Sequence, residues 1–168
     1  MFSTIGYERT SLSEFIQTLR EAEVELLVDI RDRAQSRRKG FSKTALSEAL
    51  KEAGINYLHL RTLGDPKEGR EAARAGDYDK FKEIFGAVIQ SKPAKTALSE
   101  VSELARESHV CLMCYEKDHR FCHRSIVSDK LTDILGCDVK HLEVESNDRE
   151  NSSKRRVLHT CQSASAQI

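Results

Sequence analysis

The chain alternates short apolar runs with longer segments whose apolar residues recur every three to four positions, and this alternation constrains its fold most strongly. The apolar runs cover residues 2–7, 26–30, 55–60, 110–114 and 139–144. Between them, spacings such as Leu12, Phe15 and Leu19 are typical of amphipathic helices. The pattern predicts an α/β fold, with a mostly parallel sheet of about five strands between helical layers.

Local signals mark the ends of several predicted helices. Ser11 and Glu14 have the spacing of a capping box at the start of the first helix. Gly54 directly follows a helical segment, where glycine commonly ends a helix. Pro93 separates two further helical segments. These signals support the same order of elements as the apolar pattern.

Charge is balanced over the whole chain, with 27 basic and 27 acidic residues among 168. The balance excludes a globally basic nucleic-acid binder but leaves local patches open. No stretch reaches the roughly 18 apolar residues of a membrane span, and no basic and apolar leader opens the chain. We therefore expect a cytoplasmic protein that does not contact membranes. Its five cysteines, an odd number, are expected to be reduced.

The chain is expected to contain one folded domain and a tail. Residues 1–144 carry the periodic apolar pattern, and their number suits a single domain. Residues 145–168 are rich in serine, include a short basic run at 154–156 and show no periodicity. They are predicted to form a disordered polar tail.

Polar segments follow the first four predicted strands, at residues 6–10, 29–41, 59–66 and 114–124. In parallel sheets, ligands bind beyond the carboxyl ends of the strands. We therefore expect these four segments to meet at one edge and to carry the function. The connection over residues 61–77 is unusually long for a compact domain, which predicts a lid over that edge.

The segment after the second strand is strongly basic. Residues 31–43 contain six basic residues and one acidic residue, Asp32. Arginine presents a planar fork of donors that suits phosphate or carboxylate groups. Arg31, Ser36 and Arg37 are therefore predicted to bind an anionic substrate. The alternative is a solvated basic loop that pairs with acidic neighbours elsewhere.

The segment after the fourth strand concentrates reactive side chains. They are Cys114, Glu116, Cys122, His123 and Arg124. The last three are expected to open the next helix, whose N-terminus attracts anions and lowers the pKa of a thiol, and they are predicted to bind substrate.

Three hypotheses remain open for this segment. In the first, Cys114 is a nucleophile, and Arg120 follows it at the spacing of a phosphate-cradling loop, although Glu116 and Asp118 would repel the anion. In the second, Cys114, Cys122 and His123 bind zinc, with His59 or His119 as a further ligand. In the third, the cysteines are packed and an ion pair between Glu116 and Arg124 fixes the loop.

Two residues on the neighbouring strands are candidates for acid/base chemistry. Asp29 interrupts an apolar strand, and a buried carboxylate needs a partner, which Arg31 or Arg37 could provide. Asp29 is either part of such an ion pair or a general base. His59, at the end of the third strand, is either packed or catalytic.

Four motifs together resemble the domain-of-unknown-function 488 family of bacteria and archaea. They are Thr4-Ile5-Gly6-Tyr7, Leu27-Val28-Asp29-Ile30-Arg31 with Ser36-Arg37, Tyr57-Leu58-His59-Leu60 with Leu63-Gly64, and Cys114-Tyr115-Glu116 with Cys122-His123-Arg124. The resemblance covers residues 1 to about 144 and implies an α/β fold with the motifs at one edge. It implies no reaction. The chain departs from the usual pattern at Ala34, Asp65 and His119, where proline, glycine and proline are frequent, and Asp65 adds a negative charge near the expected site.

Together these observations predict an enzyme, or a former enzyme, that acts on a phosphate-bearing substrate such as a nucleotide or nucleic acid. It would be a hydrolase or a transferase. Arg31, Arg37 and Arg124 would hold the anion. Asp29, His59 and Glu116 are the candidate acid/base groups, with Cys114 as the candidate nucleophile. No cofactor is predicted. The alternatives are a non-catalytic nucleic-acid-binding module and a small zinc protein.

Overall fold

A single five-stranded parallel sheet forms the centre of the protein. The computed structural model describes residues 1–144. The strands are β1 (Phe2–Gly6), β2 (Leu26–Asp29), β3 (Asn56–His59), β4 (Val110–Cys114) and β5 (Val139–Leu142). They lie in the order β3-β2-β4-β1-β5, and every pair is parallel. The predicted α/β fold is therefore confirmed.

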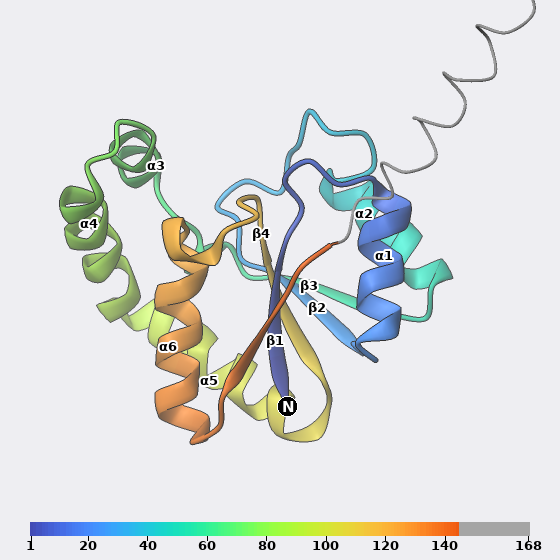
Figure 1. The fold of residues 1–168 in the computed structure, drawn as a ribbon. Coiled ribbons are helices and arrows are strands. Elements are labelled where there is room, and N and C mark those ends of the chain that lie inside the picture. The colour runs from blue at the N-terminus through green and yellow to red at the C-terminus, as the bar shows by residue number, and fades with distance from the viewer. Residues whose placement is uncertain (145–168) are drawn as a thin grey trace, which may run out of the picture.

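Helices cover both faces of the sheet (Figure 1). They are α1 (Leu12–Glu21), α2 (Lys43–Glu52), α3 (Lys67–Arg74), α4 (Tyr78–Gln90), α5 (Lys92–Glu107) and α6 (His123–Leu135), with short 3₁₀ turns η1 (Arg61–Leu63) and η2 (His119–Phe121). Helices α1 and α2 lie on one face, and α4, α5 and α6 lie on the other. No helix within residues 1–144 combines the length and the apolar character needed to span a membrane.

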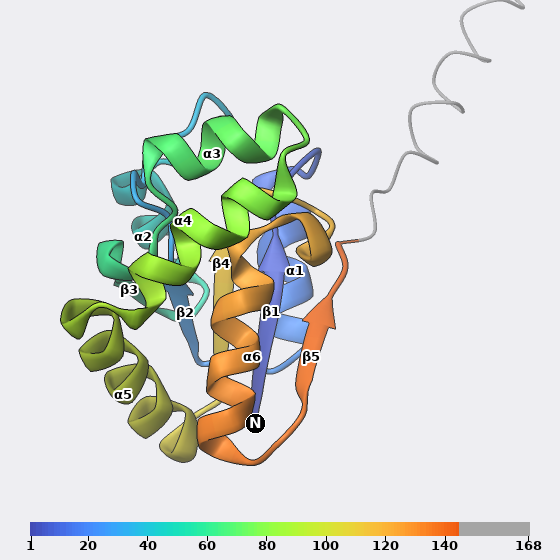
Figure 2. The same cartoon turned by 90° about the vertical axis from the view of Figure 1, so that its left-hand side faces the viewer.

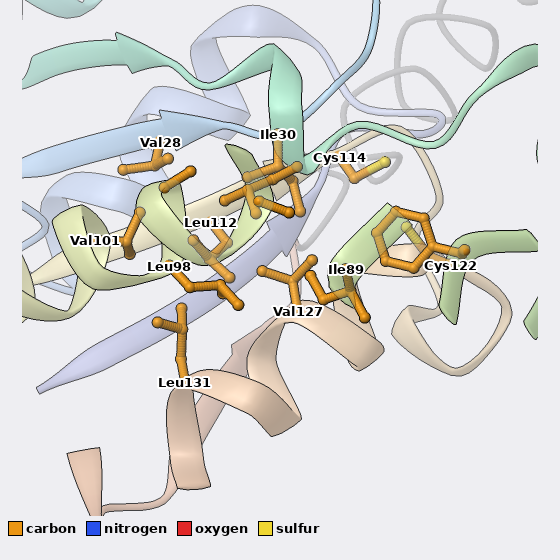
Figure 3. Close-up of a cluster of buried hydrophobic side chains, with 14 of the residues drawn as sticks. Val28, Ile30, Ile89, Leu98, Val101, Leu112, Cys114, Cys122, Val127 and Leu131 are labelled. Atoms are coloured by element: carbon orange, nitrogen blue, oxygen red, sulfur yellow. The ribbon is translucent and has the colours of Figure 1, made fainter. Parts of the chain in front are cut away.

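Each face of the sheet buries its own apolar cluster. Ile5, Leu27 and Met113 pack with α1 and α2, whereas Val28 and Leu112 pack with α4, α5 and α6 (Figure 3). Successive side chains of a strand point to opposite faces, so a strand covered on both sides must be apolar throughout. This explains why the central strand β4 is apolar throughout, whereas the edge strands β3 and β5 are only partly buried and include polar residues.

The predicted helix ends are confirmed. Ser11 caps α1, and the reciprocal bonds of a capping box with Glu14 are both present. Gly54 follows α2 with φ of +77°, a conformation that residues with a Cβ rarely adopt. Ser91 ends α4 and caps α5, whose first turn contains Pro93.

The connection after β3 differs from its prediction. Residues 61–77 do not form an irregular loop, because they contain η1 and the eight-residue helix α3. Helix α3 is rich in charge, and Gly69 and Ala72 are its buried residues, so its sequence lacks the apolar periodicity that marks the other helices. It lies at the end of the sheet where the strands finish (Figure 2). The prediction for the tail falls on residues 145–168, outside the described part of the chain.

The chain leaves neighbouring strands toward opposite faces. From β1 and β2 it passes to α1 and α2, whereas from β4, which lies between them, it passes to α6 on the other face. Such a reversal opens a crevice beyond the strand ends, where ligands of α/β proteins bind. The end of β4, at Cys114, lies at this position.

Candidate active site

A cavity of about 730 Å³ lies beyond the carboxyl ends of the strands. Its walls come from the segments that follow β1, β2 and β4, and from the segment with α3. Six arginines line it: Arg31, Arg33, Arg37, Arg38, Arg70 and Arg74. Three carboxyl groups, of Asp32, Asp65 and Glu116, line it as well. The cavity is therefore rich in positive charge although the whole chain is neutral.

Asp29 lies behind this cavity and holds Arg31. The Asp29 carboxylate is fully buried. It accepts hydrogen bonds from Arg31 Nη2 at 2.6 Å, Arg31 Nε at 2.8 Å and the Tyr57 hydroxyl at 2.7 Å. Arg31 Nη1 donates to the Tyr7 hydroxyl at 2.9 Å and to the Phe41 carbonyl at 3.0 Å. Of the two partners expected for Asp29, the structure selects Arg31.

This network favours the first of the two roles predicted for Asp29, the ion pair, over that of a general base. The carboxylate does not line the cavity, and both of its oxygens accept hydrogen bonds from protein groups. Burial, together with the negative charge of Asp29, raises the pKa of Tyr57, which therefore stays a donor. Arg31 does reach the cavity, but its guanidinium is already bound on several sides.

His59 is also placed away from the expected site. Its Nε2 is 2.8 Å from the carbonyl oxygen of Arg31. It lines a second depression, with Lys43 and Arg61, on the other side of the segment after β2. His59, predicted as packed or as an acid/base group, therefore does not line the cavity that holds Glu116. It holds the backbone at the end of β2 instead.

Three of the cavity arginines have no side-chain partner within residues 1–144. They are Arg33, Arg37 and Arg74. In contrast, Arg38 donates to the Thr10 carbonyl, and Arg70 pairs with Asp32 at 3.3 Å. These three guanidinium groups are therefore available to a ligand.

Ser36 shapes the loop between these arginines. Its hydroxyl oxygen accepts a hydrogen bond from the backbone N–H of Arg38 at 3.1 Å, and it lines the cavity. Its own backbone N–H donates to the Ser42 hydroxyl at 3.2 Å. Ser36 and Arg37, both predicted to bind substrate, do lie at the cavity.

Cys114, Glu116 and His123 line one part of the cavity, and Cys122 lies next to His123; these four residues are called the floor of the cavity. Cys114 Sγ is 3.2 Å from Glu116 Oε2 and 3.7 Å from His123 Nδ1. Cys122 Sγ is 3.8 Å from the same His123 nitrogen. The other ring nitrogen, Nε2, is 2.9 Å from the Ile30 carbonyl oxygen. Both cysteines and His123 are buried, and Figure 3 shows the two cysteines at one end of the apolar cluster.

The electrostatics of this floor favour charge separation. Burial tends to raise the pKa of the Cys114 thiol, but a hydrogen bond from Cys122 and the positive charge of His123 outweigh it and hold that pKa well below its usual range. Burial tends to lower the pKa of His123, but the negative charge of Cys114 raises it to about 9. Burial and the same negative charge raise the pKa of Glu116 to about 7. The floor therefore brings together a thiol whose pKa is lowered, an imidazole whose pKa is raised and a carboxyl group whose pKa lies near 7.

Arg124 binds the backbone of the turn after β4 and does not line the cavity. Its side chain is almost fully buried, and its Nη2 donates to the carbonyl oxygens of Glu116 at 3.1 Å and Lys117 at 3.2 Å. The same Glu116 carbonyl lies against Gly6, where an added Cβ would come within 1.9 Å of it. Arg124 therefore does not line the cavity where the anion was expected, and it binds the backbone carbonyl of Glu116, so the expected ion pair with the Glu116 carboxylate is not formed. It positions the turn after β4.

Cys122 is placed by its role as the N-cap of α6. Its Sγ accepts a hydrogen bond from the backbone N–H of Arg124 at 3.4 Å, which satisfies one of the free donors of the first turn. Cys122 does not itself line the cavity, whereas His123 does. Of the three residues expected to bind substrate at this helix start, His123 is therefore the one that reaches the cavity.

The phosphate-cradling loop considered from the sequence is not formed. Arg120 is exposed and pairs with Asp118 at 2.6 Å, away from the cavity. His119 stacks against His141, with ring centroids 3.5 Å apart. Neither His59 nor His119 joins the thiols, and within residues 1–144 the candidate metal ligands form one group: Cys114, Cys122 and His123.

Several cavity residues were not recognised in the sequence. They are Tyr7, Arg70, Arg74 and Tyr115. Two of them lie on α3, where the charged sequence was interpreted as a loop. The available signal was the paired spacing of Arg70 and Arg74, four residues apart and hence on one helical face.

Asp65 lines the cavity, as expected from the family resemblance, which implied that this residue adds a negative charge near the site. Its side chain is buried, and its Oδ1 has no hydrogen-bond partner. The carboxyl group fits because residue 69 is glycine: a Cβ there would lie 2.0 Å from Asp65 Oδ1. Burial raises the pKa of Asp65 to about 6.

The comparison with known families matches residues 11–131 to the family described as Domain of unknown function DUF488. This chain belongs to the DUF488 family. The matched region runs from the start of α1 into α6, so it includes the arginine segment, α3 and both cysteines of the floor. No curated protein and no solved structure gave a significant match. Family membership confirms the resemblance, but the family description names no activity.

Proposed function

We propose that this DUF488 protein is an enzyme, a hydrolase or transferase, that binds a phosphate-bearing substrate such as a nucleotide or nucleic acid in the arginine-lined cavity. One observation carries the proposal. Three guanidinium groups without partners among residues 1–144, those of Arg33, Arg37 and Arg74, line the same cavity as Cys114, Glu116 and His123. A substrate held by the arginines would therefore lie over the reactive groups.

The arrangement of the arginines favours phosphate over a single carboxylate. Arg33 and Arg37 come from the segment after β2, and Arg74 comes from the end of α3. Donors from two separate segments can contact several oxygens of one phosphate group or of neighbouring phosphates. Asp32 pairs with Arg70, and the Asp65 carboxyl group interacts electrostatically with His123 and Arg70, so both offset part of the positive charge without neutralising the three free arginines.

An aromatic ring at the cavity favours a nucleotide. Tyr115 lines the cavity and is 44% exposed. It packs edge-on against Tyr7, with ring centroids 5.3 Å apart. Exposed aromatic rings beside cationic grooves are where nucleobases stack. A phosphate on the arginines and a base on Tyr115 would occupy the cavity together.

The floor supplies the acid/base chemistry. The pKa of Glu116 near 7 lets this carboxyl group accept and donate protons at neutral pH, as a general acid or base requires. Of the four residues predicted as catalytic, Cys114 and Glu116 lie at the cavity, and His123 joins them. Asp29 and His59 hold the surrounding segments instead.

Replacing Arg37 tests the proposal directly. Arg37→Ala should weaken the binding of a nucleoside monophosphate by about 10- to 100-fold, because a hydrogen bond to a charged group contributes roughly 1.5–3 kcal/mol. Isothermal titration calorimetry measures the affinity. Lys39→Ala is the matched control, because Lys39 is an exposed cation of the same loop that does not line the cavity. Equal affinities of the Arg37→Ala variant and the wild type would contradict the proposal.

The non-catalytic nucleic-acid-binding module remains the second candidate, favoured by exposed cations such as Arg33 and Lys39 on one loop. It predicts that Lys39→Ala and Arg37→Ala weaken the binding of a single-stranded oligonucleotide equally. It also predicts a steep fall of affinity with salt, with a slope set by the number of phosphates contacted. An effect confined to Arg37→Ala favours the cavity of an enzyme, because Lys39 lies outside it.

A further inference from the structure

We infer that the floor of the cavity is a zinc site, with Cys114, Cys122 and His123 as ligands and Glu116 beside the fourth position. The inference deepens the proposed function, because the metal would lie at the floor of the same cavity. It can nevertheless be tested independently of substrate binding.

The distances between the three donor atoms suit one tetrahedral ion. Their ligand atoms all lie within 4.8 Å of one another. His123 Nδ1 is 3.7 Å from Cys114 Sγ and 3.8 Å from Cys122 Sγ. Tetrahedral zinc, with bonds of about 2.3 Å to sulfur and 2.0–2.1 Å to nitrogen, holds a sulfur and a nitrogen ligand about 3.6 Å apart. The side chains therefore need only small adjustments to bind the ion.

The histidine is oriented for metal binding. Its Nε2 is 2.9 Å from the Ile30 carbonyl oxygen, and a carbonyl oxygen can only accept a hydrogen bond. Nε2 must therefore carry the hydrogen, so in the neutral ring the lone pair is on Nδ1, the nitrogen that faces both sulfur atoms. A hydrogen bond from the second ring nitrogen to a carbonyl or carboxylate oxygen is the usual support of a metal-binding histidine.

The two cysteines are held by separate elements that the fold brings together. Cys114 ends β4, and Cys122 caps α6. The turn between them is fixed by Arg124, which binds the carbonyl oxygens of Glu116 and Lys117. A site built on fixed elements keeps its ligands near the positions that the ion needs.

The chemistry and the exposure of the ligands identify the kind of metal site. Two thiolates and an imidazole favour zinc over magnesium or calcium, which prefer oxygen ligands. Cys122 lies below the cavity, whereas Cys114 and His123 line it. The fourth position would therefore face the cavity, as in catalytic zinc sites, which keep one position open for water or substrate. Glu116, whose Oε2 is 3.2 Å from Cys114 Sγ, lies beside that position.

Metal analysis of the untagged full chain tests this inference. After purification with zinc and removal of free metal, inductively coupled plasma mass spectrometry should find about one zinc per chain, and Cys122→Ser should reduce zinc affinity by at least about tenfold, since loss of second-shell support alone costs about 10–100-fold. Cys137→Ser is the matched control, because it removes an exposed thiol outside the site. Circular dichroism checks that both variants fold.

Alkylation of the wild-type protein gives a readout that needs no variant. Bound zinc should protect Cys114 and Cys122 from iodoacetamide, as mapped by mass spectrometry, and leave Cys137 reactive. Substoichiometric zinc together with unchanged alkylation of Cys114 would overturn the inference. If zinc is absent but Arg37→Ala still weakens nucleotide binding, the metal site alone is wrong. If zinc is present and Arg37→Ala has no effect, the zinc site stands and the proposed function is wrong.

Discussion

Two polar clusters lie at the carboxyl edge of the sheet, and they differ in how acidic and basic groups are matched. Around Asp29, both carboxylate oxygens accept hydrogen bonds from Arg31, and Tyr57 donates a further one. At the cavity floor, the thiols of Cys114 and Cys122 share one imidazole nitrogen, His123 Nδ1, and the Glu116 carboxyl group contacts Cys114.

The sheet itself separates the two clusters. Asp29 lies in register with Met113, the residue before Cys114, and side chains alternate between the faces of a strand. Asp29 therefore points toward α1 and α2, and Cys114 points toward α6. The first cluster closes on itself and holds a loop, whereas the second faces a cavity and can bind a ligand. Burial of a charged residue in a strand is thus weak evidence for catalysis when its partners are complete.

Removal of Arg31 should have the largest effect on stability. Arg31→Met leaves the fully buried Asp29 carboxylate without its cation, and breaking a buried ion pair in this way costs about 3–5 kcal/mol. Urea denaturation followed by circular dichroism measures the free energy of unfolding. The double variant Asp29→Asn/Arg31→Met is the control and should recover part of the loss. An unchanged midpoint in Arg31→Met would show that this network does not hold the structure.

Asp65 should give a smaller, pH-dependent effect. Its pKa rises from 3.8 to about 6 in the folded protein, so the folded state binds more protons between these values. Its contribution to stability is therefore complete below pH 4 and is lost as the pH rises through 6, by at most about 3 kcal/mol. Asp65→Asn should remove this slope when unfolding is measured from pH 4 to 7.

The same substitution tests the cavity. Above pH 6, Asp65 carries a negative charge among the cavity arginines, so Asp65→Asn should tighten nucleotide binding several-fold at pH 7.5 and have little effect at pH 5. Glu71→Gln, an exposed change on α3 that does not line the cavity, is the control. Identical pH profiles of the Asp65→Asn variant and the wild type would place the carboxylate outside the anion's reach.

Arg120 should give the smallest effect. Its guanidinium is exposed and pairs with Asp118, and exposed ion pairs contribute little to stability. Arg120→Ala should leave both the denaturation midpoint and the nucleotide affinity unchanged. A marked loss of affinity would mean that the turn after β4 rearranges to bind phosphate. Arg120 would then belong to the binding site.

The sequence predicted the strands and most helices because elements that bury large side chains have apolar residues at regular spacings. It missed α3, whose buried residues are Gly69 and Ala72, because such small residues in a charged helix produce no apolar spacing. The polar segments at the sheet edge were also predicted, as was the partner of Asp29 among two candidates. The sequence left two roles open for Asp29 and for His59, and it did not show that Arg124 lies outside the cavity, because a residue's place in the chain does not indicate which way its side chain points.

The sequence by itself determined the succession of strands and most helices along the chain, the family and the concentration of arginines and thiols near the strand ends. Apolar periodicity carries the succession of elements, because each element must bury one or two faces. Only the tertiary structure decided which polar groups meet. The insertion of β4 between β2 and β1 turns Cys114 toward α6, where Cys122 and His123 begin the helix, and α3 adds Arg74 to the same cavity. These contacts depend on strand order and side-chain direction, which a linear pattern does not contain.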